Sequence, residues 1–331
     1  MRLKILVTGG AGFIGSEFVR QGVAKGHHII VIDNLTYAGD RGRIKTVEKN
    51  IAFYKVNVTA GTKVEAIIKR EKPQAIVHFA AETHVDRSIQ NAHPFIDTNI
   101  VGTQTLIDLA LKYKIPRFIH ISTDEVYGEI TQGKFREDSA LQPSSPYSSS
   151  KAAADLLIKA AIRTYRLPAI IVRPSNNYGP WQYPEKFLPV ILLKALRNKK
   201  IPVYGDGNNI REWLHVSDCV RGIYFVLEKG GIGETYNIGS DVEKKNIEVA
   251  KTILKLLNKP EDLIEFVKDR PGHDLRYALD CMKLHNLGWK PQIAFEEGFH
   301  QMVEWAKENQ DWLESKLKDL RGYWKKVYKK K

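Results

Sequence analysis

Apolar and polar positions along the chain follow two patterns, which change near residue 174. Before this point, short apolar runs alternate with stretches of helical spacing, which is typical of a parallel sheet whose strands are joined by helices. The apolar runs predict strands at residues 4–7, 28–32, 51–56, 75–79, 117–121 and 169–172. Helical spacing predicts helices at residues 13–25, 99–113 and 147–165. We therefore expect residues 1–174 to form an α/β domain around a parallel sheet.

The second part of the chain has a different pattern of predicted elements. Turn residues cluster at 174–184 and 205–209, and helical stretches at 187–197, 247–257 and 295–318 alternate with short strands. We expect residues 175–331 to form mainly a smaller, mixed α/β lobe. The segment 234–238 has a strand pattern and is expected to return to the first sheet, so the two parts are not cleanly divided.

A glycine-rich turn joins the first predicted strand to the first predicted helix. Gly9, Gly12 and Gly15 are spaced three apart, and Asp33 ends the second strand. Glycines permit a tight turn and let backbone N–H groups approach a pyrophosphate at a helix N-terminus. The Asp33 carboxylate can accept hydrogen bonds from ribose hydroxyls and would repel the 2′-phosphate of NADP, which favours NAD. A tight turn without a ligand is the alternative, but the combination predicts a Rossmann-type, doubly wound dinucleotide-binding sheet.

A second motif lies at the start of the helix that is predicted at 147–165. Ser145 is a suitable N-cap, and Pro146 suits the first helical position. Tyr147 and Lys151 are four residues apart, so their side chains lie on one helix face. A nearby ammonium group favours the phenolate, which brings a catalytic base closer to neutral pH. An exposed helix pair is the alternative; Thr123, at the end of the fifth strand, strengthens the catalytic interpretation.

Two adjacent acidic residues, Asp124 and Glu125, follow Thr123. Ligands bind beyond the carboxyl ends of the strands in sheets of this kind. Two acids at that position can take different roles, one donating a proton and the other accepting it. Elimination of water from a keto-sugar needs both roles, whereas an epimerase needs only the hydride step and the tyrosine. The alternative is that the pair caps the following turn and faces solvent.

Composition excludes several classes of protein. The chain has 331 residues, of which 43% are hydrophobic and 27% charged, as in ordinary soluble proteins. It has no apolar run that would span a bilayer and no signal-peptide pattern, so we expect a cytoplasmic protein without a membrane partner. The net charge of +13 is spread along the chain, which suits an anionic small ligand and does not require nucleic acid. Cys219 and Cys281 are far apart, and we expect reduced thiols and no metal site.

These motifs resemble a known family. Thr123, Tyr147 and Lys151 match, residue for residue, the proton-handling set of the extended short-chain dehydrogenase/reductases. Within that family, further segments resemble signatures of the dTDP-glucose 4,6-dehydratases: residues 80–88, 173–180, 204–207, 211–213 and 269–274. The likeness covers almost the whole chain and fades in the last helices and the basic tail. It implies NAD as cofactor, a nucleotide-diphosphate sugar (dTDP-glucose) as substrate, a homodimer and a role in deoxysugar biosynthesis such as that of rhamnose.

The resemblance also assigns residues to the two ligands. Those that would contact NAD are Gly9, Gly12, Phe13, Ile14, Gly15, Asp33, Asn34, Leu35, Thr36, Asn57, Val58, Ala80, Ala81, Thr98, Tyr147, Lys151 and Asn177. Those that would hold the nucleotide sugar are Thr83, His84, Asn176, Lys186, Phe187, Pro202, Val203, Tyr204, Arg211, Asn246, Asp269, Arg270, Pro271, Gly272 and His273. Arg211 and Arg270 suit a diphosphate because guanidinium groups match phosphate oxygens, although surface salt bridging is the alternative. Asn57 replaces a usual Asp and Thr83 a usual Ser; both keep the ability to form a hydrogen bond.

The resemblance implies a reaction in which each catalytic residue has a role. Tyr147 removes the proton of the C4 hydroxyl while NAD takes the C4 hydride. Glu125 then removes the C5 proton, and Asp124 protonates the leaving C6 hydroxyl before hydride returns to C6. Lys151 orients the ribose and lowers the pKa of Tyr147, and Thr123 binds the C4 oxygen.

Two alternatives remain at this point. A nucleotide-sugar 4-epimerase or decarboxylase on the same fold would not need Asp124 and Glu125. A non-catalytic NAD-binding regulator would tolerate loss of Tyr147 and Lys151. The sequence leaves open which base the nucleotide carries (thymine, uracil or cytosine) and which pathway uses the product.

Overall fold

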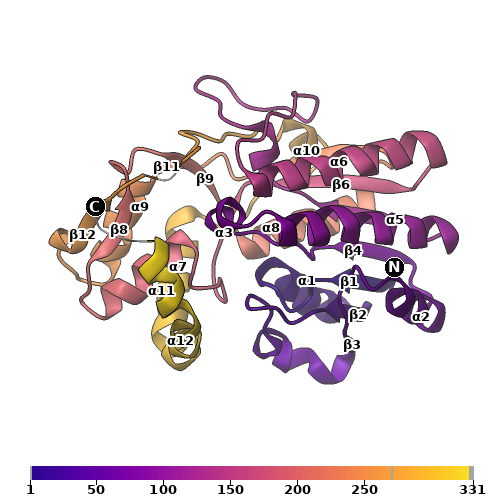
Figure 1. Ribbon diagram of the computed structural model, residues 1–331, viewed down its shortest axis with the longest axis horizontal. Helices are drawn as coiled ribbons and strands as arrows, with labels where there is room; N and C mark the ends of the chain where they lie inside the picture. The colour runs from indigo at the N-terminus through magenta and orange to yellow at the C-terminus, as the bar shows by residue number, and fades with distance from the viewer. Residues whose placement is uncertain (1, 270, 328–331) are drawn as a thin grey trace.

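The computed structural model describes residues 2–269 and 271–327, which form two lobes (Figure 1). The larger lobe contains strands β1 (Lys4–Thr8), β2 (His28–Asp33), β3 (Ile51–Lys55), β4 (Ala75–His78), β5 (Phe118–Ile121), β6 (Ala169–Pro174) and β10 (Thr235–Ile238). They form one parallel sheet in the order β10-β6-β5-β4-β1-β2-β3. This order confirms the predicted Rossmann-type α/β class, and the reversal between β1 and β4 is the point where such sheets bind ligands.

Helices cover both faces of this sheet, which is why its strands are apolar on both sides. Successive side chains of β1 point to opposite faces, so Ile5 and Val7 pack into one core cluster and Leu6 into another. The first face is covered by α1 (Phe13–Ala24) and α8 (Val216–Lys229). The second is covered by α2 (Gly61–Glu71), α5 (Gly102–Lys112) and α6 (Pro146–Tyr165).

Short helical segments connect these elements. They are η1 (Arg41–Asn50), α3 (Val85–Gln90), α4 (His93–Phe95), η2 (Ile96–Val101) and η3 (Asp124–Tyr127). The π-helical η2 runs directly into α5, so the helix predicted at 99–113 begins with a turn of different geometry. None of the helices in the part of the chain that the structure describes has the length and apolar character needed to cross a membrane.

The smaller lobe has its own sheets and core. One sheet has the order β11-β9-β7, formed by β7 (Asn176–Tyr178), β9 (Ile210–His215) and β11 (Glu243–Lys245). The other pairs β8 (Ile201–Tyr204) with β12 (Ile264–Val267). The remaining elements are α7 (Phe187–Leu196), α9 (Asn246–Leu256), η4 (Glu261–Leu263), α10 (Met282–Asn286), α11 (Phe295–Glu308) and α12 (Gln310–Val327). Apolar residues of α7, α9 and α11 pack together in the main cluster of this lobe.

Two expectations concern the second half of the chain. The segment 234–238 does return to the large sheet, because β10 pairs in parallel with β6. The single helix predicted at 295–318 is wrong, since α11 ends before Asn309 and α12 begins after it. The break lies at Asn309, whose φ of −112° and ψ of 33° are outside helical geometry and whose side-chain nitrogen donates to the Trp305 carbonyl.

Candidate active site

The glycine-rich turn between β1 and α1 presents bare backbone to a cleft. Gly9 has φ +69°, and a Cβ added there would lie 2.6 Å from the backbone nitrogen of Ala80. A Cβ on Gly15 would lie 2.2 Å from the Gly9 carbonyl oxygen, so this position also requires glycine. The α1 N-cap, Gly12, has no side chain to accept from the first helical N–H groups. These donors therefore stay available to an anion at the helix N-terminus.

Asp33 is held in place by the turn beside it. Its Oδ2 accepts from the Ala11 backbone nitrogen at 2.9 Å, and its Oδ1 accepts from the Leu35 nitrogen at 2.8 Å. Burial raises the pKa of Asp33, although these two backbone donors oppose the shift. Leu35 therefore acts through its backbone. It adopts φ +51° and is the one predicted NAD contact that does not line the cleft.

Helix α6 positions Tyr147 and Lys151, and both are buried. Ser145 and Ser148 form a reciprocal capping box that fixes the first turn, as the predicted N-cap requires. The Lys151 Nζ donates to the Ile121 carbonyl oxygen at 2.7 Å. Burial lowers the pKa of Lys151 to about 8, while Asp155 on the same helix opposes the shift.

The pKa of Tyr147 differs from what the sequence predicted. Burial raises the pKa of the phenol, the Glu125 carboxylate raises it further, and a hydrogen bond with Thr123 opposes the rise. The predicted lowering of the Tyr147 pKa by Lys151 is not found, and the Lys151 ammonium group donates to the Ile121 carbonyl instead. Tyr147 is therefore a phenol until a substrate or cofactor changes the charges around it.

Asp124 and Glu125 begin η3, directly after β5. Thr123 caps this turn, and its hydroxyl donates to Asp124 Oδ1 at 3.1 Å. Asp124 is only 3% exposed, so the alternative of a solvent-facing pair is excluded for this residue. Burial raises the pKa of Asp124 to about 8, and the carboxylates of Glu125 and Glu212 contribute to the rise. Asp124 therefore carries a proton at neutral pH.

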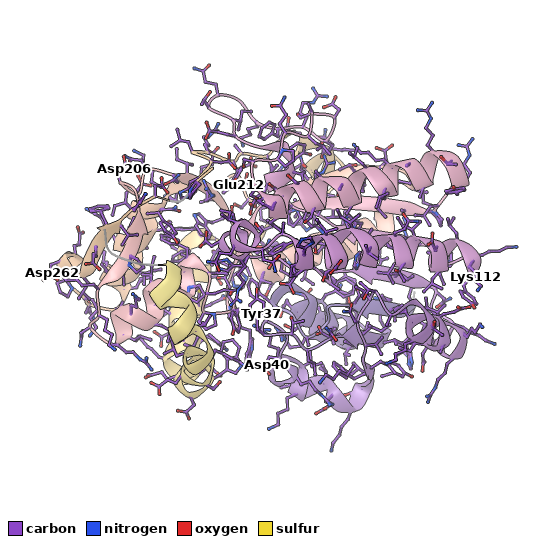
Figure 2. The ribbon with its side chains drawn as sticks, in the orientation of Figure 1. Tyr37, Asp40, Lys112, Asp206, Glu212 and Asp262 are labelled. Carbon is purple, nitrogen blue, oxygen red and sulfur yellow. The ribbon has the colours of Figure 1, made fainter. Side chains whose placement is uncertain are left out.

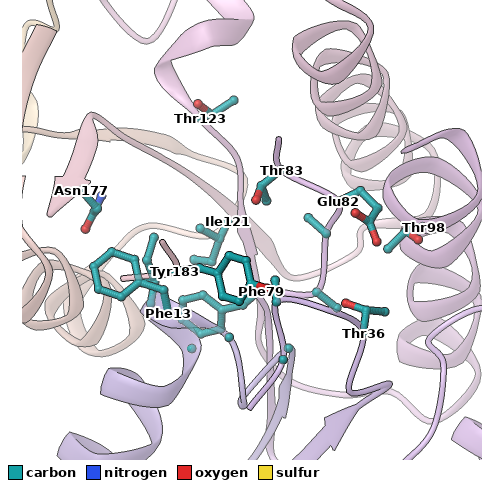
Figure 3. A pocket seen from close by; sticks show the side chains of 18 of the residues that line it. Phe13, Thr36, Phe79, Glu82, Thr83, Thr98, Ile121, Thr123, Asn177 and Tyr183 are labelled. Carbon is teal, nitrogen blue, oxygen red and sulfur yellow. The ribbon is translucent and has the colours of Figure 1, made fainter. Parts of the chain in front are cut away.

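One cleft brings the sequence-predicted cofactor and catalytic residues together (Figure 3). Thr123, Asp124, Glu125, Tyr147 and Lys151 all line it. Apart from Leu35, so does every residue predicted to contact NAD, from the glycine turn to Asn177. Figure 3 shows side chains from both lobes around this space, with Phe13 from α1 and Tyr183 from the loop after β7 among them.

Several buried polar atoms in this cleft lack a hydrogen-bond partner among the described residues. They are Arg43 Nη2, Ser122 Oγ, Asp124 Oδ2, Ser175 Oγ, Asn176 Oδ1, Asn177 Oδ1 and Gln182 Oε1. Buried polar atoms are almost always satisfied, so a set of unsatisfied ones that line one cleft indicates a polar ligand. The cleft thus fits a molecule with many donors and acceptors.

A second hollow adjoins the first and shares Glu125, Asn176 and Lys186 with it. It also gathers other predicted substrate residues: His84, Phe187, Pro202, Tyr204, Arg211, Asn246 and His273. Arg211 is not a surface salt-bridging residue, because it is buried against the Tyr277 ring and donates to the Asp274 carbonyl. Thr83 lines the first cleft instead.

The remaining predicted substrate residues lie elsewhere. The Val203 side chain points into the core of the smaller lobe and is fully buried there, so only its backbone can face a ligand. Asp269 contacts the His273 imidazole at 2.5 Å and lines neither hollow. Pro271 and Gly272 do not line them either. Arg270 lies outside the described residues.

Sequence reasoning missed several lining residues. Among them are Arg43, Gln182, Tyr183, Glu185 and Tyr277. Gln182 and Tyr183 lie in the turn-rich segment 174–184 and Glu185 directly follows it, and that cluster of turn residues beside a signature segment was the available signal. Arg43 and Tyr277 carry no local signal, because they reach the site only through the tertiary fold.

Comparisons with known proteins identify the chain's relatives. A family model described as GDP-mannose 4,6 dehydratase matches residues 6–302. A dTDP-glucose 4,6-dehydratase of Haemophilus influenzae is 48% identical over 329 residues, with 92% of this chain and 97% of the relative covered. The chain belongs to this family of nucleotide-sugar 4,6-dehydratases.

Solved structures place the same fold in 4,6-dehydratases and in epimerases. A double mutant of a dTDP-glucose 4,6-dehydratase from Streptomyces venezuelae, with NAD bound, has a TM-score of 0.92 and 44% identity, covering 95% of this chain and 100% of that chain. A UDP-glucose 4-epimerase of Thermotoga maritima has a TM-score of 0.88 and 30% identity, covering 92% and 99%. The fold alone therefore does not distinguish dehydratase from epimerase.

Proposed function

We propose that this chain is an NAD-dependent dTDP-glucose 4,6-dehydratase, a lyase that converts dTDP-glucose to dTDP-4-keto-6-deoxyglucose and water. The observation that carries the proposal is the buried Asp124, which lines one cleft with Glu125, Tyr147 and Lys151 and whose pKa burial raises to about 8. A 4-epimerase needs no such acid. The curated relatives with this name, at 45–48% identity over most of the chain, support the same activity.

NAD fits the first cleft. The glycine turn and the open N-terminus of α1 suit its pyrophosphate, and the fixed Asp33 carboxylate suits the adenosine ribose. The unsatisfied atoms of Ser122 and Ser175 suit its polar groups at the other end. The chemistry that NAD supplies when bound is hydride removal from C4 of the hexose and hydride return to C6.

The side chains of the protein move the protons. Tyr147, as the phenolate, takes the proton of the C4 hydroxyl, with Thr123 as its hydrogen-bond partner. The resulting ketone acidifies C5, whose proton goes to Glu125, and a proton adds back at C5 when hydride returns to C6. Asp124 donates its own proton to the departing C6 hydroxyl, which leaves as water. The raised pKa of Asp124 matters here because an ionised carboxylate cannot act as a general acid.

The two lobes bind different ligands in this proposal. We assign NAD binding to residues 1–174 together with β10, and substrate binding mainly to residues 175–331. The hollow beside the first cleft is lined by side chains of α7, β8 and β9, among them Phe187, Tyr204 and Arg211. We place the dTDP group there, with Arg211 beside the diphosphate. The reaction takes place in the cytoplasm.

A homodimer is the proposed assembly. Apolar side chains that are 43–64% exposed lie on η2 and α6: Ile96, Val101, Leu156 and Tyr165. The neighbouring helices α5 and α6 run along one face of the molecule (Figure 1). An exposed apolar strip on adjacent helices is characteristic of a subunit interface. A second copy of the chain would cover it.

One experiment tests both the activity and the identity of the nucleotide base. Purified protein is incubated separately with dTDP-glucose, UDP-glucose and CDP-glucose, and products are analysed by mass spectrometry. We expect loss of one water from dTDP-glucose without net accumulation of NADH. A product of unchanged mass would instead indicate a 4-epimerase.

A further inference from the structure

The loop that follows β2 forms the wall of the cleft near Asp33. Asn34, Thr36, Ala38 and Gly39 line the cleft, and Arg43 from η1 lines it as well. The Arg43 guanidinium is 1% exposed and donates to the carbonyl oxygens of Ala11 and Ala38. This loop is therefore tied to the glycine turn by backbone acceptors at its inner side.

Helix α12 contacts the same loop from the outside. The Trp312 indole nitrogen donates to Asp40 Oδ2 at 2.7 Å, and the Lys316 ammonium lies 2.6 Å from the same oxygen. Trp312 and Lys316 are four residues apart and share one helix face. Asp40 in turn caps η1 by accepting from the Gly42 nitrogen at 2.7 Å. Figure 2 shows Asp40 beside α12, at the junction of the two lobes.

Aromatic packing extends this contact to the other wall of the cleft. The Trp312 ring lies 5.3 Å from the Trp181 ring and 5.3 Å from the Arg43 guanidinium. The Trp181 carbonyl accepts from Arg43 Nε at 3.0 Å. Trp181 has φ +70°, which is unusual for a bulky residue and persists only when its surroundings enforce it. The next residue, Gln182, lines the cleft.

The surroundings of Asp40 stabilise its ionised form. Burial opposes its ionised form, but hydrogen bonds from Lys316, Gly42 and Trp312 outweigh burial and lower its pKa. Asp40 thus accepts from two separate elements at once. Helix α12 lies beyond residues 6–302, which the family model matches, so membership of the family assigns it no role.

We infer that α12 acts as a clasp, by which we mean that it holds the loop after β2 in place. Trp312 and Lys316 act through Asp40 to position this loop for dinucleotide binding. They are positioning residues, because they touch the loop and not the cleft. The inference rests on NAD binding in the proposed function. It does not depend on which sugar the protein converts. Without the clasp, the loop would have to be ordered at the moment of binding, and NAD would leave faster.

The test compares W312F and K316M with K307M. W312F keeps an aromatic ring but loses the indole donor, and K316M loses the ion pair. K307M is the matched control, because Lys307 forms an exposed ion pair with Glu304 on α11 and does not contact the loop. The rate at which NAD leaves the diluted holoenzyme is measured for each protein. The unfolding temperature is also measured with and without added NAD.

We expect NAD to leave W312F and K316M roughly three- to tenfold faster, which is the effect of losing one hydrogen bond of ordinary net strength. In both variants the NAD-dependent rise in unfolding temperature should shrink, while kcat at saturating NAD should stay unchanged. The K307M protein should behave like the parent in every measurement. If both variants release NAD at the parent rate, the clasp is wrong, even if their unfolding temperature falls. Should W312F not fold, K316M alone decides. Failure of the parent to dehydrate dTDP-glucose would refute the proposed function and leave this result unaffected.

Discussion

Asp124, Tyr147 and Lys151 show how burial sets the chemistry of single residues in this cleft. Burial raises the pKa of Asp124 and Tyr147 and lowers that of Lys151, so each shift favours the neutral form. Asp124 is therefore suited to donate a proton, while Tyr147 needs positive charge nearby before it can accept one. The two acids after β5 differ accordingly in role, although they are adjacent in sequence.

Replacing both acids separates oxidation from elimination. In the double variant D124N/E125Q, Tyr147 and Lys151 are untouched, so we expect substrate still to reduce bound NAD. Little dehydrated sugar should be released, because neither the C5 proton nor the C6 hydroxyl has a partner. Nicotinamide absorbance follows the first step and mass spectrometry the second. Water loss at the parent rate would refute the roles of both carboxyls.

The raised pKa of Asp124 also predicts how stability changes with pH. The folded state keeps the proton up to about pH 8, whereas the pKa of an Asp side chain in the unfolded chain is 3.8. The proton's contribution to stability is thus complete below about pH 4 and is lost as pH rises to about 8. D124N cannot ionise, so its free energy of unfolding relative to the parent should increase between pH 5 and pH 8 by a few kcal/mol, at ~1.4 kcal/mol per pKa unit. Equal pH profiles from urea unfolding would show that Asp124 is ionised in the fold.

At the scale of elements, α6 links a helix cap to catalysis. Its N-terminal capping box and Pro146 fix the first turn, and Tyr147 is in that turn. Lys151 and Asp155 follow at intervals of four, so all three side chains lie on the buried face. The start of α6 therefore determines where the phenol lies.

Removing the cap should weaken α6 without touching the cleft. S145A loses the acceptor for the Ser148 nitrogen, and we expect the free energy of unfolding to fall by ~1 kcal/mol. S149A is the control, since Ser149 lies in the same turn but is exposed. Chemical denaturation measures both. If S149A lowered the free energy of unfolding by the same amount, the effect of S145A would not come from loss of the cap.

At the scale of the whole molecule, the two lobes and the proposed dimer define the working unit. The cleft takes residues from both lobes, and the exposed apolar strip lies on α6, the helix that carries Tyr147. Dimerisation would thus stabilise the outer face of the helix whose inner face is catalytic.

The dimer is tested by placing a charge in the strip. Leu156 on α6 is 57% exposed, and L156D should shift the protein to monomers in sedimentation at micromolar concentration, because a buried charge at an interface is costly. L287D is the control, since Leu287 is 47% exposed at the end of α10 and belongs to neither η2 nor α6. A monomeric parent, or an L156D dimer, would contradict the proposed interface.

The sequence alone determined the elements that depend on local pattern. The parallel sheet, the glycine turn, the cap of α6 and the return of residues 234–238 to the large sheet were predicted, because each has a signal within a few residues. The break between α11 and α12 was missed, since apolar spacing continues across Asn309 although its backbone leaves helical geometry.

Only the tertiary structure decided how charged and apolar groups are buried. Val203 lies in a core and Arg43 in the cleft, and neither position follows from its neighbours in sequence. The proton on Asp124 depends partly on Glu212, and the clasp joins Asp40 to a helix 272 residues away. Desolvation and charge act between groups that are close in space, so such states exist only after distant segments have come together.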